Sequence, residues 1–224
     1  MTRVAAIDCG TNSIRLLVAD ATVGEDGRPC LADLTRQMRI VRLGQGVDAR
    51  GYLDPAAIER TVEATVEYQR MIEKLGATRT RFVATSATRD ASNSAEFVRQ
   101  IKAVIGVEPE VIVGTEEASL SFRGAVGGLG GSVRTPMLVV DIGGGSTELV
   151  LGSTSVKQAI SIDMGAVRVT EKFFSHVDPA GGVPAEDQGR AIAWIDEQLD
   201  GHQGQQREGT LEFPDDHQAH HRTQ

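Results

Sequence analysis

The sequence has no excess of basic residues, no long apolar run and no cysteine framework, and each absence excludes a class of protein. Its 224 residues carry a net charge of −8, which argues against nucleic acid as a partner. No apolar run approaches the roughly 18 residues of a membrane helix, and the start of the chain lacks a signal-peptide pattern. The two cysteines, Cys9 and Cys30, have no paired spacing. We therefore expect a reduced, cytoplasmic protein that neither binds nucleic acid nor enters a membrane.

One short pattern, Asp-x-Gly-x-x-Ser followed by apolar residues, occurs twice. The first copy lies in "IDCGTNSIRLLV" at 7–18, and the second is "DIGGGSTELV" at 141–150. Each copy follows an apolar run and leads into another, which predicts a tight turn between two strands. Two halves that begin alike indicate an internal repeat of one α/β unit.

The patterns between and after these copies predict an α/β protein. Three strands precede a helix that Asp54 caps, Pro55 opens and Gly76 ends. Strands at 81–85 and 110–113 then alternate with helices at about 94–105 and 115–125. A glycine-rich linker at 124–136 leads into strands at 137–140, 147–151 and 156–162, and then into helices at 166–174 and 185–199.

The same patterns divide the chain into three parts. We predict one domain over residues 1–125 and a partial second domain over 126–200. Residues 201–224 contain few apolar side chains, so burial cannot offset the entropy of ordering them, and we predict a disordered polar tail. The strands at 137–162 would then have an open edge and an uncovered face, which favours a homodimer.

Both turns are suited to binding anions. Successive N–H groups in a tight turn form an anion-binding nest, and serine and threonine hydroxyls add donors. Two such turns that face each other would bind neighbouring phosphates of one substrate; the alternative is a pair of ordinary glycine turns. The candidate phosphate-binding residues are Thr11, Asn12, Ser13, Gly143, Gly144, Gly145 and Ser146.

Acidic residues lie close to the second turn. Asp141 and Glu148 flank it, and a tight hairpin would bring both carboxylates to one mouth, where they could hold Mg²⁺. The alternative is that Asp141 accepts hydrogen bonds from the turn while Glu148 is solvated. In "GTEEASLSF", Glu116 and Glu117 follow a strand, and a carboxylate there could be the general base for a water attacking phosphorus. Its alternative role is a favourable charge near a helix N-terminus. Arg89 could bind phosphate or form a surface ion pair with Asp90 or Glu96.

Five segments together resemble one known family. They are "AAIDCGTNSIRLLV", "ATSATRDASN", "VIVGTEEASLSF", "LVVDIGGGSTELVLG" and "SIDMGAVRVTEKFF". Their order and spacing are similar to those of the exopolyphosphatase / guanosine pentaphosphate phosphohydrolase family, most of all its actinobacterial exopolyphosphatases. The resemblance implies a ribonuclease H-like, actin-like ATPase superfamily fold with duplicated βββαβαβα units, of which this chain completes only the first. Members of this family hydrolyse terminal phosphates of inorganic polyphosphate, and some convert pppGpp to ppGpp, with Mg²⁺.

The resemblance also implies roles for individual residues. Glu117 matches the proposed base for water activation, and Asp141 and Glu148 match the metal-associated acids. The family's phosphate-contacting positions match Asn12, Ser13, Gly143, Gly144, Gly145 and Ser146. Arg89 matches an arginine of the family's "TSATRDA" motif. Family chains continue beyond the end of this one, which we interpret as a truncation or frameshift. The alternative function is therefore an inactive paralogue that binds polyphosphate or nucleotide without hydrolysis. A small-molecule kinase is disfavoured, because no second nucleotide-binding motif follows the hairpin at 137–152.

Overall fold

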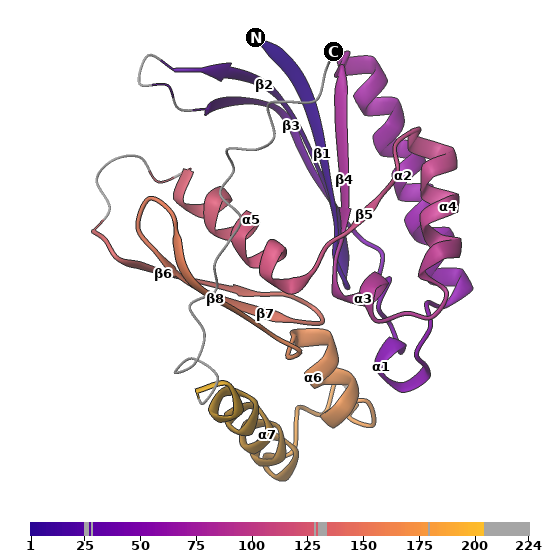
Figure 1. Ribbon diagram of the computed structural model, residues 1–224. Helices are drawn as coiled ribbons and strands as arrows, with labels where there is room; N and C mark the ends of the chain where they lie inside the picture. Colours follow the sequence, from indigo (N-terminus) through magenta and orange to yellow (C-terminus); the bar gives the residue numbers. More distant parts are fainter. Residues whose placement is uncertain (25–26, 28, 128, 130–133, 179, 204–224) are drawn as a thin grey trace.

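The computed structural model describes residues 1–24, 27, 29–127, 129, 134–178 and 180–203, arranged around two β-sheets (Figure 1). The predicted tail at 201–224 lies outside the described residues from 204 onward, whereas 201–203 belong to the last helix. None of the helices in the described part has the length and hydrophobicity needed to cross a membrane. The α/β class predicted from the sequence is the class observed.

The first sheet has five strands in the order β3-β2-β1-β4-β5. Their bounds are β1 Thr2–Cys9, β2 Ser13–Val23, β3 Pro29–Ile40, β4 Arg79–Ala84 and β5 Glu110–Val111. Strands β1 to β3 are antiparallel neighbours, while β4 pairs parallel with both β1 and β5. The carboxyl ends of β1, β4 and β5 therefore meet at one edge, where α/β proteins place their ligands.

Helices α2 and α4 cover one face of this sheet (Figure 1). The helices that follow its strands are α1 Val47–Arg50, α2 Pro55–Leu75, α3 Ser86–Arg89, α4 Ser94–Ile105 and α5 Gly114–Gly127. Helix α2 begins as predicted, because the Asp54 carboxylate accepts a hydrogen bond from the Ala56 N–H at 2.9 Å. It ends at Gly76, whose φ of 73° is the left-handed conformation that glycine adopts at low cost.

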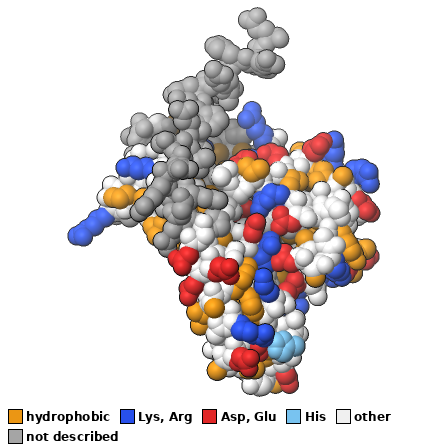
Figure 2. Space-filling model, turned by 60° about the horizontal axis from the view of Figure 1, so that its bottom comes forward, with side chains coloured by type: hydrophobic (Ala, Val, Ile, Leu, Met, Phe, Trp, Pro, Cys, Tyr) orange, Lys and Arg blue, Asp and Glu red, His pale blue; other side chains and the backbone are white. Residues whose placement is uncertain are grey.

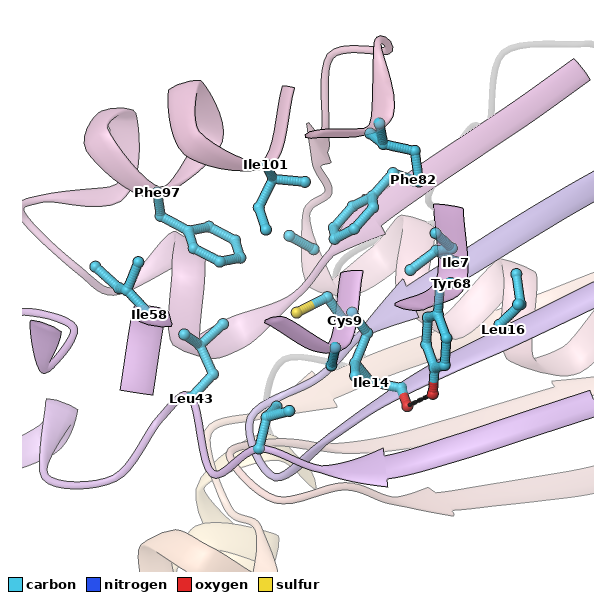
Figure 3. Close-up of a cluster of buried hydrophobic side chains, with 14 of the residues drawn as sticks. Ile7, Cys9, Ile14, Leu16, Leu43, Ile58, Tyr68, Phe82, Phe97 and Ile101 are labelled. Atoms are coloured by element: carbon cyan, nitrogen blue, oxygen red, sulfur yellow. Dashed lines mark hydrogen bonds between the residues drawn. The ribbon is translucent and has the colours of Figure 1, made fainter. Parts of the chain in front are cut away.

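The main hydrophobic core lies between this sheet and its two helices (Figure 3). Ile14 from β2, Phe82 from β4 and Phe97 from α4 are all fully buried there. The Tyr68 hydroxyl donates a hydrogen bond to the Ile14 carbonyl at 3.0 Å, so this buried polar group is satisfied. The core fixes β1 and β2, and with them the turn that joins them.

The second sheet is antiparallel, in the order β6-β7-β8. Its elements are β6 Met137–Ile142, β7 Thr147–Gly152 and β8 Val156–Ile162, followed by helices α6 Ala166–Phe173 and α7 Ala185–Gln203. Below, the N-terminal unit means β1–β5 with α1–α4, and the C-terminal unit means β6–β8 with α6 and α7.

Helix α5 joins the two units and packs on the second sheet. Ala118 and Phe122 of α5 form a small core with Val150 and Ala159. The predicted boundary after residue 125 thus assigns to the first domain a helix that packs on the second. The opposite face of β6 is open, with Leu138, Val140 and Ile142 exposed by 63%, 50% and 70%.

Candidate active site

The two copies of the sequence pattern fold into the same hairpin turn. In the first turn, residues 10–13, the Gly10 N–H donates to the Ser13 carbonyl at 2.9 Å. In the second turn, residues 143–146, the Gly143 N–H donates to the Ser146 carbonyl at the same distance. The predicted repeat is therefore present in the backbone hydrogen bonding as well as in the sequence.

The residues that flank the two turns differ in charge. Asp8 is paired across its hairpin with Arg15, and their charged groups lie 3.5 Å apart. Asp141 occupies the place of Asp8 in the second hairpin, but it is paired with Glu148. Directly paired residues of antiparallel strands project from the same face. One hairpin thus presents an ion pair, whereas the other presents two acids.

Both turns open into one cleft of about 220 Å³. Nine of the eleven predicted site residues line it: Thr11, Asn12, Ser13, Glu117, Asp141, Gly143, Gly144, Ser146 and Glu148. The other two predicted residues, Arg89 and Gly145, are not among its lining residues. The cleft therefore brings together residues from both units and from the connecting helix α5.

Gly145 lies where the second turn packs against the N-terminal unit. A Cβ atom at this position would lie 2.6 Å from the Ser86 Oγ and 2.7 Å from the Thr11 Oγ1. These two hydroxyls are hydrogen bonded to each other at 2.8 Å and are buried. Only glycine allows so close an approach without displacing its neighbours.

The backbone of both turns retains hydrogen-bonding capacity. Among the described residues, the N–H groups of Thr11, Asn12, Gly144 and Gly145 donate to no partner. Groups of this kind are the donors of an anion-binding nest. On the face shown in Figure 2, basic and acidic side chains are interspersed. Attraction for an anion would therefore come from local donors in the cleft rather than from a broad basic surface.

Glu117 lies in the first turn of α5 and is largely buried, with a side chain 20% exposed. Its Oε2 atom is buried and has no hydrogen-bond partner among the described residues. Burial, followed by repulsion from Glu148, raises the pKa of Glu117 to about 7, although Arg89 opposes the rise. Such a carboxyl group can accept or release a proton near neutral pH, as a general base requires.

Hydrogen bonds from serines orient the two acids beside the second turn. The Ser121 hydroxyl donates to Asp141 Oδ2 at 2.6 Å, and the Ser161 hydroxyl donates to Glu148 Oε1 at 2.8 Å. Glu148 is only 1% exposed, so the alternative of a solvated glutamate is wrong. Burial raises the pKa of Glu148, while the hydrogen bonds from Ser161 and Ser146 act in the opposite direction.

The donor chemistry of this pair suits Mg²⁺. The ion prefers oxygen ligands and is commonly held by one or two carboxylates together with water and substrate phosphates. Asp141 and Glu148 supply two such carboxylates on one face of a hairpin. Within the described residues, no group of three or more acids, histidines or cysteines has the geometry of a complete metal site. The pair fits a shared protein–phosphate site rather than an all-protein one.

Arg89 lies beside Glu117. Its Nη1 donates to the Ile112 carbonyl at 3.0 Å and lies 3.8 Å from Glu117 Oε2. Its Nε is 3.9 Å from Asp90 Oδ1, so the alternative ion pair with Asp90 is present as well. The guanidinium is therefore placed to influence the charge of Glu117.

Sequence reasoning missed Asp8, Arg15, Thr85 and Ser86, which also line the cleft. The repeat could have revealed the first two, because Asp8 and Arg15 match Asp141 and Glu148 at a constant offset. Burial raises the pKa of Asp8, with Arg15 opposing the rise and Asp141 adding to it. Thr85 and Ser86 lie in the segment "ATSATRDASN", which could have revealed them, and the Ser86 hydroxyl is hydrogen bonded to that of Thr11.

Several known proteins resemble this chain in sequence. It is 53% identical over 184 residues to Exopolyphosphatase 2 of Mycobacterium tuberculosis (strain H37Rv), covering 80% of this chain and 57% of that protein. It is 34% identical over 198 residues to the Bifunctional 3-dehydroquinate synthase/phosphatase of Fusobacterium nucleatum, covering 87% of this chain and 30% of that protein. The chain thus spans less than two thirds of the length of the curated relatives that it matches.

Solved structures show the same likeness. An exopolyphosphatase-like protein superposes with a TM-score of 0.81 at 44% identity, covering 89% of this chain and 61% of that chain. The Aquifex aeolicus member of the Ppx/GppA family gives a TM-score of 0.67 at 34% identity, covering 88% and 61%. These likenesses confirm the predicted α/β fold, which this chain shares with both structures. Residues 18–210 match the Ppx/GppA phosphatase family, and the chain belongs to this family.

Proposed function

We propose that this chain carries the active site of an exopolyphosphatase-type hydrolase, which removes the terminal phosphate of inorganic polyphosphate. The observation that carries the proposal is Glu117: a buried carboxyl group with a free oxygen and a pKa of about 7, in the cleft that both turns line. Family membership and the 53% identity to an exopolyphosphatase support it.

The geometry suggests the following reaction. The N–H groups of the two turns bind oxygens of the terminal phosphate. Glu117 accepts a proton from a water molecule as the water oxygen attacks phosphorus. The bond from phosphorus to the bridging oxygen breaks, and the products are orthophosphate and a chain one phosphate shorter. Donors fixed before the reaction stabilise the charge that spreads over the transferred oxygens.

Mg²⁺ would be held by Asp141 and Glu148, where it would offset negative charge on the phosphates. The Ser121 and Ser161 hydroxyls keep these two carboxylates in place. We propose that Arg89, which matches an arginine of the family's "TSATRDA" motif, acts chiefly through Glu117, because its guanidinium lowers the pKa of that carboxyl group. Guanosine pentaphosphate is the alternative substrate, since it also carries a terminal phosphoanhydride.

Binding without hydrolysis is the second candidate function. The matched region covers 57% of the length of the mycobacterial relative. A cleft whose walls are held less firmly would still bind an anion. Hydrolysis is more sensitive, because a displacement of about 1 Å at the reacting atoms can lower its rate on the order of 100-fold.

Phosphate release from long-chain polyphosphate with Mg²⁺ tests the proposal. Glu117→Gln should lower release at least about 100-fold, the usual contribution of a general base. Glu116→Gln is the matched control, because Glu116 is the neighbouring acid of the same helical turn and pairs with Arg81 at 3.0 Å. Equal release by the wild-type and Glu117→Gln chains would contradict the catalytic role. No release by either, with a melting temperature still raised by polyphosphate, would favour the binding function.

A further inference from the structure

The segment "GAVRVTE" at 165–171 contacts the second turn, yet the proposed reaction does not use it. It contains the start of α6. The Ala166 N–H donates to the Gly143 carbonyl at 2.9 Å. The N–H groups of Val167 and Arg168 both donate to the Gly144 carbonyl, at 2.8 and 3.2 Å. The first amides of α6 are thus occupied by the turn, so this helix end serves to hold the turn rather than to bind a ligand directly.

The Arg168 side chain continues the same contact and extends it to the N-terminal unit. Its Nε donates to the Gly145 carbonyl at 2.9 Å. Its Nη1 lies 2.8 Å from Asp48 Oδ1, and its Nη2 donates to Asp90 Oδ2 at 3.0 Å. The side chain is 19% exposed. One guanidinium therefore uses all three nitrogens, one on the second turn and two on acids of the other unit.

These bonds fix the direction of three successive peptide groups. In a planar trans peptide, the carbonyl of one residue and the N–H of the next point in opposite directions. Helix α6 binds the carbonyls of Gly143, Gly144 and Gly145. The N–H groups of Gly144, Gly145 and Ser146 must then point away from α6. Arg168 holds the third of these peptides through its side chain.

We propose that Arg168 is a positioning residue of the phosphate cleft. It orients the Gly145–Ser146 peptide so that its N–H is available to a phosphate oxygen, and it holds the second turn against the N-terminal unit through Asp48 and Asp90. The choice of phosphate as ligand rests on the proposed function, whereas the positioning of the turn does not.

Arginine is the side chain that this place requires. Its rigid planar fork can reach three acceptors in one plane, whereas a lysine ammonium is a point charge on a flexible stem. A second contact joins the same elements, because the Gly46 N–H donates to both carboxylate oxygens of Glu171 at 2.9 and 3.1 Å. Loss of the Arg168 side chain should therefore loosen the turn without separating the units.

The test compares Arg168→Gln and Arg168→Lys with the wild-type chain and with Arg190→Gln. Arg190→Gln is the control, because Arg190 is an exposed arginine that pairs with Asp187, and neither residue lines the cleft. Amide hydrogen exchange of residues 142–148 is measured on the ligand-free chain. Binding of tripolyphosphate is then measured by calorimetry.

We expect exchange in this segment to accelerate about 10-fold or more in both Arg168 variants, and the dissociation constant for tripolyphosphate to rise about 10- to 100-fold, as for loss of a hydrogen bond with a charged partner. Arg190→Gln should change neither. Unchanged exchange in both Arg168 variants would overturn the proposal. Wild-type behaviour of Arg168→Lys would also contradict it, because a positive charge without the planar guanidinium would then be sufficient.

The two proposals can fail separately. If the wild-type chain neither binds tripolyphosphate nor releases phosphate, the proposed function fails, while exchange on the ligand-free chain still decides the role of Arg168. Should Arg168→Gln not fold, Asp48→Asn gives the same test. It removes one acid from the guanidinium but leaves the bond to Gly145, so we expect a smaller acceleration in the same segment.

Discussion

Replacing Glu117 with glutamine should stabilise the protein at high pH but not at low pH. Burial and the neighbouring acid Glu148 raise the pKa of Glu117 from 4.5 to about 7. Below pH 4.5, this carboxyl group is mostly neutral in both the folded and the unfolded chain, so it does not lower the free energy of unfolding. Above pH 7 it is charged in both, and the folded state carries the cost of a buried charge. The gap between the two pKa values corresponds to about 3 kcal/mol of unfolding free energy.

The glutamine variant stays neutral at every pH and so avoids this cost. Its unfolding free energy, relative to that of the wild-type chain, should rise by about 2 to 3 kcal/mol between pH 5 and pH 8. Urea unfolding followed by circular dichroism measures this difference. Glu116→Gln, a change at the exposed neighbour that pairs with Arg81, is the control for replacing an acid in the same helical turn. A pH-independent difference for Glu117→Gln would refute the assigned pKa and its cause.

The same pKa determines the pH dependence of catalysis. A base must be deprotonated, and a group with a pKa of about 7 is mostly protonated at pH 6 and mostly ionised at pH 8. Phosphate release should therefore increase about 10-fold between these two values before it levels off. Under the proposed function, Glu117 would lower stability over the range in which it supports activity, a compromise that is common at catalytic sites.

Three further predictions concern other parts of the structure. Ser121→Ala removes the hydroxyl that donates to Asp141 and should lower the apparent affinity for Mg²⁺ about 10-fold in a metal titration of phosphate release. Gly145→Ala places a methyl group 2.6 Å from a serine hydroxyl and should destabilise by about 1–3 kcal/mol in urea unfolding. Gly124→Ala, which meets nothing within 4 Å, should not destabilise. If the exposed face of β6 forms a homodimer, Leu138→Lys should convert it to monomer in light scattering; a chain that is monomeric before the change would contradict the dimer.

Local sequence signals predicted the turns and the long helix because each depends on a few adjacent residues. The glycines and serines of the repeated pattern leave a tight turn as the simplest conformation. Asp54, Pro55 and Gly76 each satisfy a requirement of a helix end within one turn of the chain. Turns and helix ends do not depend on what packs against them, so the sequence was sufficient to predict them.

Long-range packing explains what the sequence could not show. The apolar residues of α5 indicate a buried face, but they do not say which of two sheets it covers. Gly145 has the same local pattern as Gly143 and Gly144, yet it packs against Thr11 and Ser86 and is not among the residues that line the cleft. The partners of Arg168 lie far from it in the sequence, at Asp48 and Asp90. No local pattern predicts these contacts.

The repeat also explains how one framework can serve two chemical roles. The turns share their backbone hydrogen bond, so both present N–H groups to the cleft. Their flanking pairs differ at a single position, where Arg15 in one hairpin corresponds to Glu148 in the other. With arginine beside it, Asp8 is partly neutralised, so the first turn would attract an anion. With glutamate, Asp141 gains a second acid, and the pair would attract a cation that could in turn bridge to phosphate. Under the proposed function, a terminal phosphate between the two turns would thus meet hydrogen-bond donors on one side and metal-binding acids on the other, and both kinds of group stabilise the charge of phosphoryl transfer.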